Sequence, residues 1–141
     1  MQQLHPQLYA DTVTLGLLPL SRVLLMNDAQ YPWLILVPQR AGITEVFQLS
    51  AKDRQQLDQE SCSIASILMT HFQADKLNIA ALGNVVPQLH IHHIVRFKSD
   101  AAWPKPVWGT KPSIPYSKEQ LAQRSEELIA LLEPISGFEH Y

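Results

Sequence analysis

Three of the six histidines of this 141-residue chain fall within four positions, at His90, His92 and His93. Gln88, His90 and His92 recur at a spacing of two, with an apolar residue between each pair. A spacing of two is the period of a β-strand, so we expect these three side chains on one face of a strand. Two imidazoles flanked by an amide indicate a polar site that binds or attacks an anion.

The stretch Gln88–Arg96 resembles the signature of the histidine triad (HIT) superfamily, in which three histidines alternate with apolar residues. When the two are aligned on Arg96, His90 takes the middle, nucleophilic position and His92 takes the last. Gln88 replaces the first histidine. The chain therefore resembles the bacterial branch of HIT-like hydrolases that carries glutamine at the first triad position.

The resemblance covers roughly residues 20–98 in the expected order. Residues 23–38 are similar to the family's first hairpin, with Asn27 and Asp28 in its turn. A long helix follows, and a glycine turn at 83–84 precedes the signature. The resemblance implies a HIT-like domain that forms a homodimer.

Two departures concern the nucleoside pocket. Many members have a histidine after the hairpin proline, in the pattern Pro-x-His, whereas this chain has Pro32-Trp33-Leu34. The connection from Asn78 to Gly83 is also shorter than in many members. Both departures affect the identity of the substrate more than the phosphate chemistry.

An imidazole is a competent nucleophile toward phosphorus near neutral pH, because its usual pKa is about 6.5. It needs a locked tautomer, in which the attacking nitrogen is bare and the other nitrogen donates its hydrogen to an acceptor. The resemblance implies that His90 attacks the α-phosphorus of a dinucleoside polyphosphate, a nucleoside phosphoramidate or a related conjugate. Water then hydrolyses the nucleotidyl-histidine, so we expect ping-pong kinetics and retained configuration at phosphorus.

The other two members of the triad have supporting roles in this prediction. His92 is placed to donate to a phosphate oxygen or to the leaving group. Gln88 can donate to phosphate but cannot carry a proton. The predicted catalytic residues are therefore His90, His92 and Gln88.

The resemblance also implies a set of substrate-binding residues. Asn27 and Asp28 fall where family members hold the ribose hydroxyls. Gly83 brings backbone N–H groups toward phosphate, and Asn84 is placed to donate to phosphate or ribose. Asn78, on the strand before this turn, completes the set.

No cofactor is expected to be required, because hydrogen-bond donors rather than cations neutralise the developing charge. A divalent metal could still accompany a polyphosphate substrate. Two rival interpretations stay open. His90 and His92 could be two zinc ligands, with His71, His93 or an acidic residue as the third. The chain could also be a nucleotide-binding or regulatory module that kept the fold and lost turnover.

The composition limits the class of protein. Residues 1–141 are one domain by size, and 46% hydrophobic with 17% charged residues is typical of a globular protein. A net charge of −2 gives no general attraction to nucleic acid or to a membrane surface. Cys62 is the only cysteine, which fits a reducing compartment. The first residues do not read as a signal peptide and no apolar run could span a bilayer, so we expect a cytoplasmic protein.

The apolar patterns predict an α+β fold with an antiparallel sheet of about five strands, one long helix and a C-terminal helix. Residues 4–20 are predicted to form an irregular arm with one short strand. The strands are expected over 12–17, 22–26, 33–37, 77–82 and 89–97, a short helical turn over 44–47, and the helices over 51–72 and 117–133. Residues 100–116 form a loop rich in tryptophan and proline.

For four residues near the signature, the sequence supports less specific predictions. His93 points to the opposite face of a regular strand and is expected to be a core or interface histidine. Arg96 is expected to be a solvated residue at the strand end. Trp103 and Trp108 are more often core or dimer anchors than platforms for a nucleobase.

Overall fold

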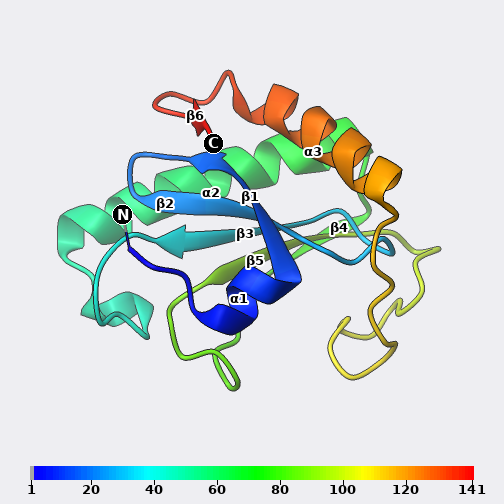
Figure 1. Cartoon of the computed structure of the whole chain (residues 1–141), viewed down its shortest axis with the longest axis horizontal. Helices are drawn as coiled ribbons and strands as arrows, with labels where there is room; N and C mark the ends of the chain where they lie inside the picture. Colours follow the sequence, from blue (N-terminus) through cyan, green and yellow to red (C-terminus); the bar gives the residue numbers. More distant parts are fainter. Residues whose placement is uncertain (1) are drawn as a thin grey trace.

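The computed structural model describes residues 2–141, and Met1 lies outside the described residues. One antiparallel sheet has the strand order β4-β5-β3-β2-β1-β6 (Figure 1). Five strands are six residues long, and β6 has two residues, so the predicted α+β fold of about five strands is confirmed. The elements are α1 (Pro6–Asp11), β1 (Thr12–Leu17), β2 (Ser21–Met26), β3 (Trp33–Pro38), η1 (Val46–Gln48), α2 (Ala51–Phe72), β4 (Lys76–Ala81), β5 (Ile91–Arg96), α3 (Lys118–Leu132) and β6 (Glu139–His140).

The long helix α2 has the predicted bounds because local capping defines both ends. Ser50 Oγ accepts a hydrogen bond from the Asp53 backbone N–H at 3.1 Å, which satisfies one of the free donors of the first turn. At the other end, Gln73 adopts a left-handed conformation with φ of 49°. Its N–H closes the last turn onto Met69 and Thr70.

The prediction for the first residues was incomplete, since α1 occupies part of the segment expected to be irregular. Pro6 stands at the first helical position, where its missing N–H costs nothing. The His5 ring caps the helix, with Nδ1 accepting from the Gln7 N–H at 3.1 Å. Histidine is an unusual cap, so the usual sequence signals do not identify this helix.

Strand β5 is shorter than predicted and begins at Ile91. The Leu89 N–H donates to the Ile43 carbonyl at 3.0 Å, outside the sheet. Gln88 and His90 therefore lie ahead of the strand rather than in it.

The central strands β2, β3 and β5 are buried on both faces. One face, here called the helix face, packs against α2 and α3 through Val23, Leu25, Leu34, Leu36, Val95, Leu57, Ile64, Leu68, Leu128 and Leu132. The opposite face, here called the loop face, is covered by the first residues and the 100–116 loop through Leu4, Leu8, Leu24, Trp33, Ile35, Ile94, Ala102 and Val107. Covering both faces explains why these strands read as nearly continuous apolar runs.

His93 lies on the helix face, as the strand period predicts. It is fully buried and donates from Nδ1 to the Ile91 carbonyl at 3.2 Å. Its Nε2 then accepts from the hydroxyl of Ser61 on α2 at 2.7 Å. Burial lowers the pKa of His93 to about 4, against the opposing effect of the Ile91 carbonyl. The ring is therefore a neutral link between sheet and helix.

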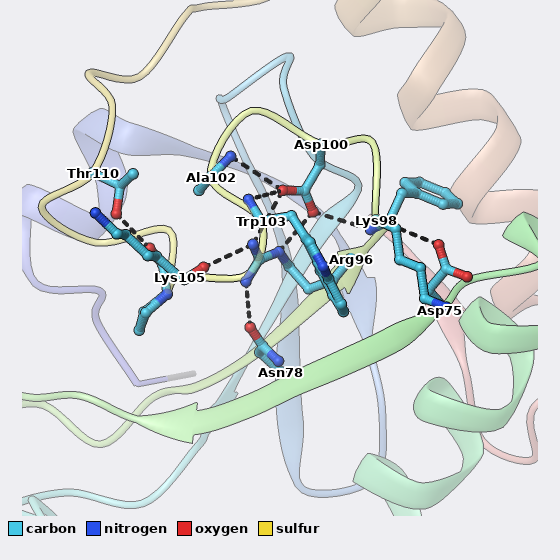
Figure 2. Close-up of polar contacts among 11 residues, drawn as sticks. Asp75, Asn78, Arg96, Lys98, Asp100, Ala102, Trp103, Lys105 and Thr110 are labelled. Carbon is cyan, nitrogen blue, oxygen red and sulfur yellow. Dashed lines mark hydrogen bonds and ion pairs between the residues drawn. The ribbon is translucent and has the colours of Figure 1, made fainter.

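Arg96 anchors the cover of the loop face, and the expectation of a solvated side chain was wrong (Figure 2). The side chain is 2% exposed and makes two bonds to Asp100, at 2.8 and 3.1 Å. It also donates to Asn78 Oδ1 at 2.6 Å and to the Lys105 carbonyl at 2.8 Å. A buried guanidinium is tolerated here because acceptors surround it.

Asp100 connects this ion pair to the backbone of the loop (Figure 2). Its carboxylate accepts the N–H groups of Phe97, Ala102 and Trp103 at 2.8 to 3.1 Å. Burial raises its pKa, but the bonds from Arg96, Phe97 and Trp103 outweigh burial and lower the pKa overall. The carboxylate therefore stays ionised, and the loop start is held on β5.

Replacing Asp100 should destabilise the whole domain. Asp100→Ala leaves the buried Arg96 charge without its partner, which typically costs about 3–5 kcal/mol of unfolding free energy. Urea unfolding measures this loss. The matched control is Arg40→Ala, which removes an exposed partner 2.7 Å from Asp53 and should change stability little. Equal effects of the two substitutions would contradict the assigned role of Asp100.

Acid should destabilise the protein partly through His93. In the unfolded chain His93 binds a proton below about pH 6.5, whereas the folded ring resists protonation until about pH 4. The contribution of the neutral His93 ring to folding stability is complete above about pH 6.5 and is lost as the pH falls. Between pH 7 and 5, wild type should lose about 2 kcal/mol more stability than His93→Gln. Urea unfolding at both pH values tests this, and equal losses would refute it.

Candidate active site

His90 sits immediately before β5, where the backbone carbonyl of Gln88 fixes its tautomer. His90 Nδ1 lies 2.7 Å from that oxygen. Because a carbonyl oxygen only accepts, Nδ1 carries the hydrogen, and Nε2 of the neutral ring is bare. This is the locked form that the sequence analysis expects of a nucleophile.

His92 has the opposite tautomer. Its Nδ1 accepts a hydrogen bond from the indole N–H of Trp33 at 3.0 Å, so Nε2 carries the hydrogen. Burial, helped by the neighbouring His90 and His93, lowers the pKa of His92 to about 3. At neutral pH the ring is therefore an uncharged hydrogen-bond donor.

The two rings lie beside each other, with centroids 4.9 Å apart and planes at 75°. Both are nearly buried, at 5% and 3% exposure for His90 and His92. The pair brings together a bare nitrogen on one ring and an N–H on the next. Such a pair can attack an electrophilic centre and donate to a developing negative charge there.

Two tryptophans enclose His92. The Trp33 ring centroid lies 5.6 Å from that of His92, and the Trp108 centroid lies 5.0 Å away. The two indoles meet edge to face at 5.9 Å. Trp33 begins β3, whereas Trp108 belongs to the 100–116 loop that Arg96 holds in place.

A cleft of about 420 Å³ is also lined by these two tryptophans, whereas His90 and His92 do not line it. Asn27 and Asp28, both predicted to bind ribose, line it together with the two indoles. The remaining lining residues are Ala10, Asp11, Met26, Val107, Gly109, Lys111, Ser113 and Pro115. The cleft and His92 therefore share Trp33 and Trp108 as walls, and the space suits a flat ring with polar groups at its rim.

Asn27 and Asp28 also shape the cleft. Asn27 Oδ1 accepts the Tyr116 N–H at 2.9 Å, which closes the end of the loop onto the hairpin. Asp28 Oδ1 accepts the Gln30 N–H at 3.0 Å, in the turn geometry typical of aspartate. Asp28 Oδ2 takes part in no hydrogen bond among residues 2–141.

Gly83 and Gln88 lie on the His90 side. Both border a cavity of about 20 Å³ that His90 also lines. The amide of Gln88 contacts the N-terminal arm, residues 2–5. Its Oε1 accepts from the His5 N–H at 2.8 Å, and its Nε2 donates to the Gln3 carbonyl at 3.0 Å. Gln88 thus fastens the arm beside the histidine pair.

The remaining predicted residues lie apart from the histidine rings. Asn78 Oδ1 accepts a hydrogen bond from Arg96, beneath the loop (Figure 2). Asn84 is exposed in the bend between β4 and β5 and has no hydrogen bond in the part of the chain described. The structure therefore groups Gly83 and Gln88 around His90 and groups Asn27 and Asp28 around the cleft.

No group of three His, Cys, Asp or Glu side chains within residues 2–141 is arranged to hold a metal ion. His93, one candidate third ligand, faces α2 instead. The other histidine candidate, His71, lies 3.0 Å from Glu127 of α3. No helix of this described region is long and apolar enough to cross a membrane.

Two features of the site were missed from the sequence. Trp33 was treated only as a departure from Pro-x-His, although an indole N–H is a donor that a buried histidine can use. The pair Arg96 and Asp100 was not recognised, although its spacing of four residues across a strand end is visible in the sequence. Neither pattern is specific without knowledge of which face each side chain occupies.

The chain as a whole is similar to a known family of proteins. Residues 8–99 match the HIT domain. A search of curated proteins found no match. A solved structure of a histidine triad protein from Marinobacter aquaeolei VT8 is 51% identical, with a TM-score of 0.92, and the match covers 96% of this chain and 99% of that one.

Two further solved structures of histidine triad proteins are similar to this chain. The one from Bradyrhizobium japonicum is 44% identical with a TM-score of 0.87, covering 94% of this chain and 96% of that chain. The one from Sinorhizobium meliloti 1021 is 41% identical with a TM-score of 0.88, covering 96% and 98%. Because the HIT domain matches most of the chain and these three proteins are 41% to 51% identical to it over nearly their whole length, the chain belongs to the HIT family.

Proposed function

We propose that this protein is a nucleotide hydrolase or nucleotidyl transferase that acts on the α-phosphate of nucleotide conjugates through a nucleotidyl-His90 intermediate. Proteins of the HIT family are typically nucleotide hydrolases or transferases. The observation that carries the proposal is the bare Nε2 of His90, fixed by the Gln88 carbonyl at 2.7 Å, beside the N–H of His92.

The reaction follows from these two tautomers. His90 Nε2 attacks the α-phosphorus, and the bond to the leaving group breaks. His92 donates its Nε2 hydrogen to an oxygen of the reacting phosphate or to the leaving group. Water then displaces His90 from phosphorus and releases the nucleotide. Backbone N–H groups near Gly83 are the further donors in this scheme.

The nucleoside belongs in the 420 Å³ cleft in this proposal. The indole of Trp108 forms one wall for the base, and Asp28 Oδ2 accepts from a ribose hydroxyl. Asn27 holds the rim and stays a predicted ribose ligand. Asn78 and Asn84 also stay predictions, since neither side chain lies in the cleft.

Several broader expectations remain proposals of the same kind. We expect turnover without a required cofactor, although a divalent cation could accompany a polyphosphate substrate. We also expect a homodimer in the cytoplasm, with a small-molecule nucleotide substrate and no nucleic-acid or membrane partner. The edge strand β4, which is longer than the other edge strand β6 and has Ile79 49% exposed, offers a surface for a second copy.

The His90 intermediate is directly measurable. After rapid quenching with diadenosine polyphosphate or an adenosine phosphoramidate, intact-protein mass spectrometry should find one AMP on wild type. His90→Ala should carry none and should lose more than about a thousandfold in turnover. The matched control is His71→Ala, a histidine outside the site, which should keep both adduct and activity.

The same experiment separates the rival interpretations. If no nucleotide gives an adduct or AMP, the protein is a binding module rather than an enzyme. If activity disappears on exhaustive chelation and no adduct forms, His90 and His92 act as metal ligands. Adduct formation in His90→Ala would contradict the assigned nucleophile.

Trp108 should determine affinity for the base. Base stacking on an aromatic side chain is worth about 1–3 kcal/mol, so Trp108→Ala should raise KM about tenfold or more. Trp108→Phe should retain most of the affinity. A ribose phosphate substrate that lacks a base should be insensitive to either change, and an equal KM increase for that substrate would refute the stacking role.

A further inference from the structure

Trp33 controls which nitrogen of His92 accepts a hydrogen bond. It is the first residue of β3 and is 5% exposed. β3 pairs Ile35 with His92, so Trp33, two residues before Ile35, projects from the same face as His92. Its Nε1–H donates to His92 Nδ1 at 3.0 Å. An indole nitrogen only donates, at any pH, so this bond has one direction.

The bond opposes two other forms of His92. Both the Nδ1–H tautomer and the imidazolium would place a hydrogen against the indole N–H. The other neighbours do not favour a cation either. The ring centroid of His92 lies 4.9 Å from that of His90, in the segment before β5, and 5.0 Å from that of Trp108, in the loop. His93 lies on the same strand but faces α2. None of these groups is a carboxylate.

A neutral donor limits the leaving groups that the site can release. When the P–O bond of a phosphoanhydride breaks, the leaving oxygen takes the electron pair and departs as a phosphate anion, which needs no proton. When the P–N bond of a phosphoramidate breaks, the nitrogen needs a proton to depart as an amine. A neutral imidazole is a far weaker acid than an imidazolium, and the Gln88 amide has no acidic proton.

We propose that Trp33 is a positioning residue that holds His92 as a neutral Nε2–H donor. As a result, the site prefers nucleotide phosphoanhydrides, which release an anion, over nucleoside phosphoramidates, which release an amine. The preference rests on the proposed function, whereas the hydrogen bond and the tautomer do not.

The bonds balance without an added acid. The bond from His90 Nε2 to phosphorus forms as the P–O bond breaks, and the leaving phosphate keeps the electron pair. Water then attacks phosphorus, the P–N bond breaks, and the electron pair returns to Nε2. The proton lost by water passes to solvent, so no proton has to come from His92.

The tautomer is tested on the protein without substrate. At pH 7, ¹⁵N NMR of the histidine rings should find His92 protonated at Nε2 only in wild type. Trp33→Phe, which keeps a ring but removes the donor, should give a mixture of tautomers. Trp108→Phe leaves the bond intact and should match wild type. The positioning role would be overturned if wild-type His92 carried a hydrogen on Nδ1 or were cationic. It would also be overturned if the tautomer of His92 in Trp33→Phe were the same as in wild type.

The leaving-group preference is tested with two substrates that share AMP. At pH 7, wild-type kcat/KM should be at least about tenfold higher for diadenosine tetraphosphate than for an adenosine phosphoramidate. Trp33→Phe should narrow this ratio, because the indole N–H no longer opposes the imidazolium form of His92. Equal or better use of the phosphoramidate by wild type would overturn the preference.

The NMR measurement and the comparison of the two substrates can fail independently. If neither substrate is turned over, the proposed function and the preference both fail, while the NMR result still decides the role of Trp33. If Trp33→Phe does not fold, the wild-type spectrum and the wild-type substrate ratio each retain the power to reject the proposal.

Discussion

The burial of the central strands on both faces is the constraint on which the rest of this structure depends. Two helices cover one face of the sheet, and the other face is covered by the N-terminal residues and the 100–116 loop. A loop has unsatisfied backbone groups and few apolar contacts, so it needs polar anchors to cover a sheet. Arg96 and Asp100 supply them, through an ion pair that is 2% exposed on each side.

The candidate active site uses the space between this cover and the sheet. His92 projects from β5 into the loop face, where Trp33 and Trp108 surround it. Burial makes a charged imidazole unfavourable, so the protein fixes a neutral ring and selects its tautomer through a neighbouring donor. For His90 a backbone carbonyl makes the opposite selection. Two chemically identical side chains thereby obtain complementary roles from their surroundings.

Side chains of β5 alternate between the two faces of the sheet, so neighbouring histidines on this strand have different surroundings. His92 and His93 are adjacent in sequence, but they face opposite layers. His93 links β5 to Ser61 on α2 and is a structural histidine, whereas His92 contacts His90. Gln88, which the sequence predicts to be a catalytic residue, uses its side-chain amide to fasten the N-terminal arm.

The sequence alone determined the fold class, the bounds of β1 and α2 and the nucleophile candidate, because period and capping are local properties. It also predicted that His93 faces away from His92. It did not determine the cover of the loop face, since Arg96, Asp100 and Lys105 meet only when the loop folds back on β5. Nor did it determine the tautomer of His92, because Trp33 lies 59 residues away and reaches it only through the pairing of β3 with β5. Protonation states depend on the groups that tertiary packing places around a ring, so tertiary structure decided the chemistry of the site.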